Sequence, residues 1–399
     1  MLVSRKRFIH AGSLATASMI IPRFLSAFEA PVQVPAGNKV VIVLQLSGGN
    51  DGLNTVIPVS NDIYYRNRPI LGIKKADSLK LTDDAGLHPA LTAFKAFYDE
   101  GSLGILNSVG YPDPDRSHFR SMDIWHSASE SDKYLNDGWI GRFLDSQISR
   151  SEKPTQALEI DDTLSLALKG KHAKALAMKD PKRLYSSANE KFFKELVRTH
   201  QQEHEATTAS YLYKTMADTI SSADYIFNQS RMHPATAPYP KTEIGNSLRT
   251  IASLIFSDIN TKVYYLSLGS FDTHVSQNNR QTKLFSDMND AVDVFVKDLK
   301  ANNRFQDVLL MSFSEFGRRV IQNASNGTDH GTANNMFFIS GGLKKQGLLN
   351  PLPDLANLND GDLKFQVDFK DVYATVLRNW LNANDKEILG KQYQPMDFV

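Results

Sequence analysis

"KVVIVLQLSGGNDGLNTVIP", residues 39–58, decides the fold class. Residues 40–46 form a short, β-branched apolar run, and the turn "SGGND" follows at once. A run of this length that ends in a glycine-rich turn is typical of a buried strand in a parallel sheet. Asp51 therefore comes directly after a strand, and open α/β sheets bind their ligands at the carboxyl ends of strands.

The same pattern recurs along the chain. Further strands are predicted at residues 103–109, 263–268, 308–313 and 336–339. Amphipathic helices are predicted around residues 91–98, 284–299 and 368–381, because their apolar residues recur every three or four positions. The alternation of strands and helices predicts one α/β domain over residues 36–399, with a polar helical insertion around residues 183–232.

The composition narrows the classes of function. The chain has 399 residues, 41% hydrophobic and 22% charged, as in ordinary globular proteins. The net charge is +1 and no Lys/Arg tract stands out, which argues against a nucleic-acid partner. Cysteine is absent, so no disulfide or thiolate metal site can form. Any metal must use imidazole or oxygen ligands, which favours zinc, manganese, magnesium or calcium.

Residues 1–30 have the layout of an export signal. "SRKRFIHAGSLATASMIIPRFLSAFEA" has basic residues, a weakly apolar stretch and small residues near its end. "SRKRFI" resembles the twin-arginine motif, with Lys6 where the second arginine usually lies. The segment is too short and too polar to span a bilayer. We expect cleavage, a periplasmic or otherwise exported protein, and no membrane span in the mature chain; the alternative is a disordered basic tail.

Acidic and histidine side chains follow several of the predicted strands. Asp272 and His274 follow residues 263–268, Glu315 follows residues 308–313, and "TDHG" precedes the last strand. Carboxylates that converge at one edge of a sheet repel one another, so a metal ion or an arginine should lie among them. The alternative for each residue is a structural role as a turn residue, a helix cap or an arginine partner. The candidate metal ligands are Asp51, Asp272, His274, Glu315, Asp329 and His330.

The loop "YPDPDRSHFRSMDIWHS", residues 111–127, holds a second group of candidates. A helix is predicted to begin near Ser117, which makes this serine a helix cap or a nucleophile whose oxyanion the helix N-terminus favours. Arg116 could hold an anionic substrate, and His118 could be a metal ligand or a proton donor. Spacing alone favours the cap for Ser117.

Seven motifs together resemble the exported bacterial family known as domain of unknown function 1501. They are "LSGGNDGLNT", "LHPAL", "GYPDPDRSHFRSMDIW", "DGWIGRFLD", "SFDTHVSQ", "SFSEFGRRVIQNASNGTDHGTAN" and "DFKDVYATVLRNWL", which span nearly the whole mature chain. The family is grouped with the alkaline phosphatase-like superfamily. The resemblance implies a three-layer α/β/α sandwich with a mostly parallel sheet and, in active relatives, two divalent metals that bind phosphate or sulfate esters.

The resemblance also implies roles for single residues. Asp51 matches the aspartate after the first strand, and Ser117 matches the nucleophile at a helix start. Asp272 and His274 match an Asp–His pair that relatives space more widely. Glu315 matches an aspartate whose neighbour is a histidine in relatives, but Phe316 stands here and cannot bind a metal. His330 matches the last histidine ligand, and Asp329 or His118 would have to replace the ligand that Phe316 removes.

Three functions follow from these observations. The first is an exported hydrolase of phosphate or related esters that uses one or two divalent ions (zinc, manganese or calcium) and acts on an anionic small molecule or a glycan ester. In this hydrolase Arg116 or Arg318 would bind the anion. The second is a non-catalytic exported protein of the same fold that binds a glycan or a protein partner. The third is a structural domain with charged loops, which requires Asp51, Glu315 and His330 to lie far apart.

Overall fold

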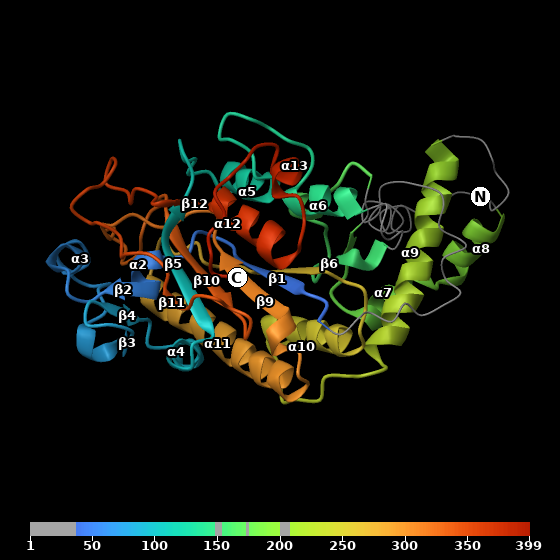
Figure 1. Ribbon diagram of the computed structural model, residues 1–399, viewed down its shortest axis with the longest axis horizontal. Coiled ribbons are helices and arrows are strands. Elements are labelled where there is room, and N and C mark those ends of the chain that lie inside the picture. The colour runs from blue at the N-terminus through green and yellow to red at the C-terminus, as the bar shows by residue number, and fades with distance from the viewer. Residues whose placement is uncertain (1–36, 148–153, 173–174, 200–207) are drawn as a thin grey trace. The chain divides into compact units, whose positions relative to one another are not determined.

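The computed structural model describes residues 37–147, 154–172, 175–199 and 208–399 (Figure 1). The predicted export signal, residues 1–30, lies outside this part of the chain. The chain forms two compact units. Among the described residues, one unit lies within Leu135–Thr236 and Arg249–Tyr265, and the other, larger unit comprises Lys39–Tyr134, Ala237–Leu248 and Leu266–Val399. All residues predicted for the functional site fall in the larger unit; the single domain predicted over residues 36–399 stays a prediction.

The strands predicted at residues 40–46, 103–109, 308–313 and 336–339 belong to the sheet of the larger unit, and two short strands that were not predicted, β11 (Gly347–Leu348) and β12 (Val367–Asp368), join it. Neighbouring strands in this sheet follow the order β11, β5 (Leu103–Gly110), β10 (Asn334–Ile339), β9 (Val308–Phe313) and β1 (Val40–Leu46). β12 also pairs with β5. β1 and β9 are parallel, with Val40 opposite Val308, and β11 and β12 are parallel to β5. Only β10 runs antiparallel to its neighbours in these described strands, so the sheet is mostly parallel.

Helices cover both faces of this sheet. On one side, Phe94 of α4 (Thr92–Asp99) packs edge-to-face on Phe337 of β10, at 5.5 Å between ring centres, and α11 (Gln277–Ala301) lies beside α4. On the other side, Trp125 of α5 (His118–Ser127) stacks on Phe313 of β9 at 4.9 Å. α12 (Phe369–Thr375) lies next to α5 on that side (Figure 1). The three layers confirm the predicted α/β/α fold.

Shorter elements complete the larger unit. An antiparallel sheet has the order β2 (Val56–Pro58), β4 (Ala85–Leu87), β3 (Leu79–Lys80). The short helices are α2 (Gly52–Thr55), α3 (Asp62–Asn67) and α13 (Asp385–Leu389), with 3-10 turns at Lys75–Asp77 and Phe305–Asp307 and a π-helical turn at Val376–Trp380.

The smaller unit is mainly helical in the described residues. Its helices are α6 (Trp139–Gln147), α7 (Pro181–Ala188), α8 (Lys191–Thr199) and α9 (Thr208–Ser230), with 3-10 turns at Pro154–Gln156 and Leu166–Leu168. β6 (Ala157–Glu159) is parallel to both β7 (Leu176–Ala177) and β8 (Val263–Leu268). β8 and α10 (Glu243–Phe256) each belong partly to both units. None of the helices described in either unit is long and apolar enough to cross a bilayer.

The glycine turn after β1 brings the loops of the site together. Gly48 has a φ of 118° and Gly49 a φ of 73°, and residues with a side chain rarely adopt such positive φ angles. A Cβ atom on Gly48 would clash with the backbone nitrogen of Asp272. The amide of Phe271 donates to the carbonyl of Ser47 at 3.1 Å. The chain before Asp272 therefore lies directly against the turn that follows β1.

Candidate metal centre

Four segments of the larger unit supply the side chains of the candidate centre. Asp272 and His274 lie in the loop after β8, Glu315 follows β9, and Asp329 and His330 lie in the loop before β10. His118 is the first residue of α5. These segments are far apart in sequence, so only the fold brings their side chains together.

One carboxylate oxygen, Oδ1 of Asp272, is the centre of the cluster. The Nε2 atoms of three imidazoles lie around it, at 3.1 Å for His274, 3.3 Å for His330 and 3.6 Å for His118. The ligand atoms of His118, Asp272 and His330 all lie within 4.8 Å of one another. Ligand atoms around a four-coordinate zinc ion lie about 3.3 Å apart, so the cluster has the dimensions of a metal site.

Each of the three imidazoles is held from behind through its Nδ1 atom. His118 Nδ1 lies 2.9 Å from Oε1 of Glu315, and His274 Nδ1 lies 3.1 Å from Oδ1 of Asp329. His330 Nδ1 lies 2.8 Å from the carbonyl oxygen of Arg116. An oxygen acceptor on the outer nitrogen fixes the ring and leaves the inner nitrogen for a metal, as in histidine-ligated metal sites generally.

The inner nitrogens of His118 and His330 are placed to bind a cation. The Nε2 atom of His118 is buried and has no hydrogen-bond partner among the described residues. His330 must donate its Nδ1 hydrogen to the carbonyl of Arg116, so its Nε2 carries a lone pair in the neutral ring. That lone pair faces Nε2 of His274 at 3.0 Å. An Nε2 hydrogen on His274 satisfies this contact, and a divalent ion bound by the imidazoles could replace that hydrogen. The ligand set of imidazoles and one carboxylate fits such an ion.

The electrostatics favour the metal-binding forms of His330, Asp272 and Asp329, but not that of His118. Burial lowers the pKa of His330, which favours the neutral ring. Burial acts to raise the pKa of Asp272, but the hydrogen bond and charge of Arg318 outweigh it, so this pKa lies below its usual range. A hydrogen bond from Asn323 lowers the pKa of Asp329. The hydrogen bond to Glu315 raises the pKa of His118, so a proton and a metal compete for that ring.

Glu315 lies behind the cluster. Its side chain is fully buried, and Oε1 accepts hydrogen bonds from the amide of Gly48 at 2.8 Å and from His118. The structure thus brings Glu315 to the centre through His118, and its predicted role as a direct ligand stays a prediction.

Asp51 has other partners. The carboxylate caps α2 through the amide of Leu53 at 3.2 Å and pairs with Nη1 of Arg68 at 2.5 Å. Gln277 also donates to it. Both charged side chains are buried, at 1% exposure for Asp51 and 0% for Arg68. The structure therefore gives this carboxylate an arginine as its counter-charge, and the metal role predicted for Asp51 stays a prediction.

The guanidinium of Arg318 forms its hydrogen bonds with acceptors of the protein itself. It is buried, and its guanidinium donates to the carbonyls of Gly48, Gly49, Phe271 and Thr328 as well as to Oδ1 of Asp272, at 2.7 Å. This side chain holds the loops of the centre in place.

The segment at Arg116 and Ser117 leads into the centre. Ser117 is exposed at the N-cap position of α5, but its hydroxyl makes no capping hydrogen bond. The guanidinium of Arg116 pairs with the buried carboxylate of Asp362 and lies 3.5 Å from Asp360. Within the described part of the chain the Ser117 hydroxyl thus makes no capping bond and adjoins the candidate ligand His118, whereas Arg116 has a carboxylate partner. Both catalytic roles stay predictions.

Phe316 packs against the imidazoles. Its ring centre lies 4.9 Å from that of His118 and 4.7 Å from that of His330. A Cβ atom on Gly49 would clash with this ring, so the turn after β1 fits around it. Phe316 supplies no metal ligand, and it forms a solid wall beside the cluster.

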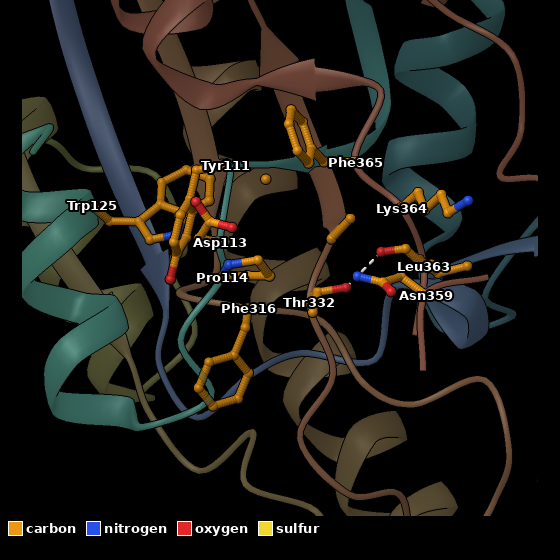
Figure 2. A pocket seen from close by; sticks show the side chains of 12 residues that line it. Tyr111, Asp113, Pro114, Trp125, Phe316, Thr332, Asn359, Leu363, Lys364 and Phe365 are labelled. Atoms are coloured by element: carbon orange, nitrogen blue, oxygen red, sulfur yellow. Dashed lines mark hydrogen bonds between the residues drawn. The ribbon is translucent and has the colours of Figure 1, made fainter. Parts of the chain in front are cut away.

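A pocket of about 290 Å³ shares Phe316 with this cluster (Figure 2). Figure 2 shows Tyr111 and Trp125 on one side, with Leu363 and Asn359 on the other. The pocket is not predicted from the sequence, because its walls come from the end of β5 and the loop after it, from Trp125 near the end of α5, from the loops next to β9 and β10, and from residues 359–365. The aromatic residues of "YPDPDRSHFRSMDIW" were the one available signal.

The chain is similar in structure to several solved proteins, at low sequence identity. Among solved structures it is similar to the PsFucS1 sulfatase from Pseudoalteromonas sp., with 13% identity and a TM-score of 0.40, over 99% of this chain and 75% of that one. It is also similar to a protein of the alkaline phosphatase superfamily from Vibrio parahaemolyticus, with 10% identity and a TM-score of 0.35, over 98% of this chain and 78% of that one. No curated protein matches the sequence.

The family comparison is more specific. The model described as "Protein of unknown function (DUF1501)" matches residues 102–398. This range is most of the chain and includes every candidate ligand except Asp51. The chain therefore belongs to the DUF1501 family.

Proposed function

We propose that this protein is an exported metal-dependent hydrolase of phosphate or related esters. One observation carries the proposal: three imidazoles, each fixed through Nδ1, direct Nε2 at one oxygen of Asp272. A cluster of this kind binds a cation, and a bound cation stabilises the negative charge that develops when an ester of an oxyacid is cleaved.

Zinc or a similar ion fits the ligands best. His118, Asp272 and His330 would hold it, and His274, whose Nε2 lies 3.1 Å from Oδ1 of Asp272, would supply a fourth ligand. A set rich in imidazole suits zinc, whereas calcium takes six to eight oxygen ligands. A zinc ion would polarise the ester and lower the pKa of a nearby hydroxyl or water.

The remaining residues of the centre have separate tasks. Glu315, Asp329 and the carbonyl of Arg116 orient the imidazoles and hold the Nδ1 hydrogens. The exposed hydroxyl of Ser117 is the nucleophile in this proposal, since it adjoins His118 and has no capping bond. Arg116 would have to exchange part of its contact with Asp362 to bind an anion.

The alternative is a non-catalytic exported protein that binds a glycan or a protein partner. Two observations favour it. Phe316 lies against His118 and His330, where it offers no ligand for a second ion. Asp51 is paired with Arg68, which leaves one fewer carboxylate for metals. In this alternative the centre holds one structural ion or none.

Metal analysis and hydrolysis assays together test the proposal. Protein purified without chelator is expected to contain about one zinc or manganese ion per chain, and His330→Ala should lose it. The exposed His233, outside the cluster, gives a matched control as His233→Ala. Phosphate monoesters, phosphate diesters and sulfate esters should be screened with Ser117→Ala beside the parent protein. Bound metal without hydrolysis by the parent would select the non-catalytic alternative, and absence of both would remove the hydrolase.

A further inference from the structure

Among the residues that the structure describes, the larger unit exposes six large apolar side chains: Ile70, Phe119, Tyr134, Val275, Ile321 and Phe365. Two of these have a local role, since the ring of Tyr134 lies 3.9 Å from the guanidinium of Arg120 and Phe365 lines the pocket described above. The other four are more than half exposed, from 54% for Ile321 to 87% for Phe119. These four form what we call the apolar rim: Ile70, Phe119, Val275 and Ile321.

Two members of the apolar rim adjoin candidate metal ligands. Phe119 follows His118 at the start of α5, and Val275 follows His274 in the loop after β8. The Nε2 atoms of both histidines lie near Oδ1 of Asp272, at 3.6 Å and 3.1 Å. Consecutive Cα atoms lie about 3.8 Å apart, so both apolar side chains start one residue away from the cluster.

Ile321 lies on a segment that hydrogen bonds tie to two candidate ligands. The amide of Arg319 donates to the carbonyl of Asp329 at 3.0 Å. The side-chain amide of Asn323 donates to the carbonyl of His274 at 3.0 Å and to Oδ1 of Asp329 at 3.2 Å. The segment on both sides of Ile321 therefore borders the centre.

Ile70 lies beside that segment. Its amide donates to Oε1 of Gln322 at 2.9 Å, as does the amide of Leu71. The apolar rim is thus distributed over four segments that covalent or hydrogen bonds connect to the centre. Single exposed apolar side chains are normal on a protein surface, whereas several of them around one polar centre mark an interaction surface.

Two guanidinium groups border the same centre. The carbonyl of Arg116 accepts from Nδ1 of His330, and the amide of Arg319 holds Asp329. Both guanidinium side chains are partly exposed, and each lies 3.5 Å from the exposed carboxylate of Asp360. Such exposed ion pairs contribute little free energy, so an incoming oxyanion can replace them. The occupant of this surface should therefore present oxyanions next to apolar groups.

We propose that the apolar rim docks on a phospholipid bilayer, so that the phosphate of a lipid headgroup lies at the candidate metal centre. A phospholipid surface presents both phosphate oxyanions and, just beneath them, acyl chains that bury apolar side chains. Four side chains on four separate segments suit a fluid surface, because a folded partner would need side chains that match their spacing. The inference rests on the proposed function only for placing the phosphate at the metal ligands, and the docking is tested without metal or catalysis.

Single cysteine labels locate the surface that meets the bilayer. The chain has no cysteine, so one introduced cysteine carries a dye at one place only. Val275→Cys and Ile321→Cys report on the apolar rim, and Met232→Cys, an exposed apolar position of the smaller unit, is the matched control. With phosphatidylcholine vesicles in EDTA, an environment-sensitive dye on the rim should shift to shorter wavelength saturably, and the dye at position 232 should not.

Vesicle sedimentation measures the strength of docking. Phe119→Ala should lower the partition coefficient of the full chain about tenfold, the effect of burying part of a phenyl ring. Met232→Ala should leave the coefficient unchanged. Any affinity of residues 1–30 for lipid is common to the parent and both variants, so the difference belongs to the apolar rim.

Zinc tests the position of the headgroup. Saturating zinc should raise the affinity of the parent for phosphatidylcholine vesicles about tenfold, the effect of one charge-assisted contact. It should not raise the affinity for vesicles of digalactosyldiacylglycerol, which has no phosphate. His330→Ala should lose the increase in zinc and keep the docking in EDTA. An equal increase with both lipids would remove the phosphate from the centre.

Three results would overturn the docking: no vesicle-dependent shift at positions 275 and 321, an equal shift at position 232, or a shift that follows protein concentration without vesicles. The last would make the apolar rim an interface between two copies of the chain. The outcomes also separate this inference from the hydrolase. Docking by a protein that cleaves no ester keeps the rim and removes the enzyme, and hydrolysis of soluble esters without vesicle binding keeps the enzyme and removes the docking.

Discussion

The substitution Asp51→Asn tests whether Asp51 is a structural carboxylate or a metal ligand. Its carboxylate is 1% exposed, and its charged partner, Arg68, is 0% exposed. The change removes the negative charge and leaves the guanidinium buried without a counter-charge. Breaking a buried ion pair in this way costs about 3–5 kcal/mol of unfolding free energy.

For Asp51→Asn we expect a loss of unfolding free energy at the lower end of that range. Arg68 keeps hydrogen bonds to Asn54 Oδ1 at 2.7 Å and to the carbonyls of Val320 and Arg319, both at 2.9 Å. These acceptors continue to solvate the cation, so we expect a loss of about 3 kcal/mol. Asp329→Asn is the matched control, since that carboxylate is 57% exposed and its ion pair should contribute about 0–1 kcal/mol.

The assay is urea unfolding followed by circular dichroism, with EDTA and again with saturating zinc. If the pairing with Arg68 is what Asp51 does, the loss is the same with and without zinc. The double variant Asp51→Asn, Arg68→Met should lose less than the sum of the two single changes, because the partners are coupled. A loss below about 1 kcal/mol in EDTA that grows in zinc would refute this reasoning and make Asp51 a metal ligand.

Three further predictions concern other parts of the molecule. Burial raises the pKa of Glu159 from 4.5 to about 8, so the folded protein keeps a proton that the unfolded chain releases. The free energy of unfolding should therefore fall by up to about 1.4 kcal/mol per pH unit between pH 5 and 8, and Glu159→Gln should flatten that slope in urea titrations; an unchanged slope would contradict it. Zinc at 100 times its dissociation constant should stabilise the protein by about 2.7 kcal/mol in thermal melts. His330→Ala should abolish this effect and His233→Ala should keep it. Glu315→Gln should lower zinc affinity about 10–100-fold in competition with a chelating dye, since Glu315 orients His118; undiminished affinity would show that His118 needs no such support.

The elements of the larger unit were predictable because their signals are local. The apolar runs at residues 40–46 and 308–313 are the strands β1 and β9, with the predicted bounds. The antiparallel direction of β10 was not predictable, because residues 336–339 are as apolar as the parallel strands. Strand direction depends on the path of the connecting chain, and no residue of β10 records it.

For the candidate site, the sequence predicted which residues lie near one another but not which of them pair. Asp272, His274 and His330 were expected together, and the structure brings them together because each follows or precedes a strand of the sheet. Sequence could not assign partners within the cluster. Asp51 and Glu315 both follow apolar strands, yet Asp51 meets Arg68, at the end of α3, and Glu315 meets His118. Such choices depend on side-chain geometry over a few ångströms.

The formal charges around Asp272 have a consequence for the speed of substrate capture. Asp272, Glu315 and Asp329 carry three negative charges, and Arg318 carries one positive charge. A divalent ion brings the sum to zero. A centre with no net charge attracts a distant anion only weakly, so an anionic substrate should reach it by unassisted diffusion. The second-order rate constant of substrate capture should therefore change little with ionic strength.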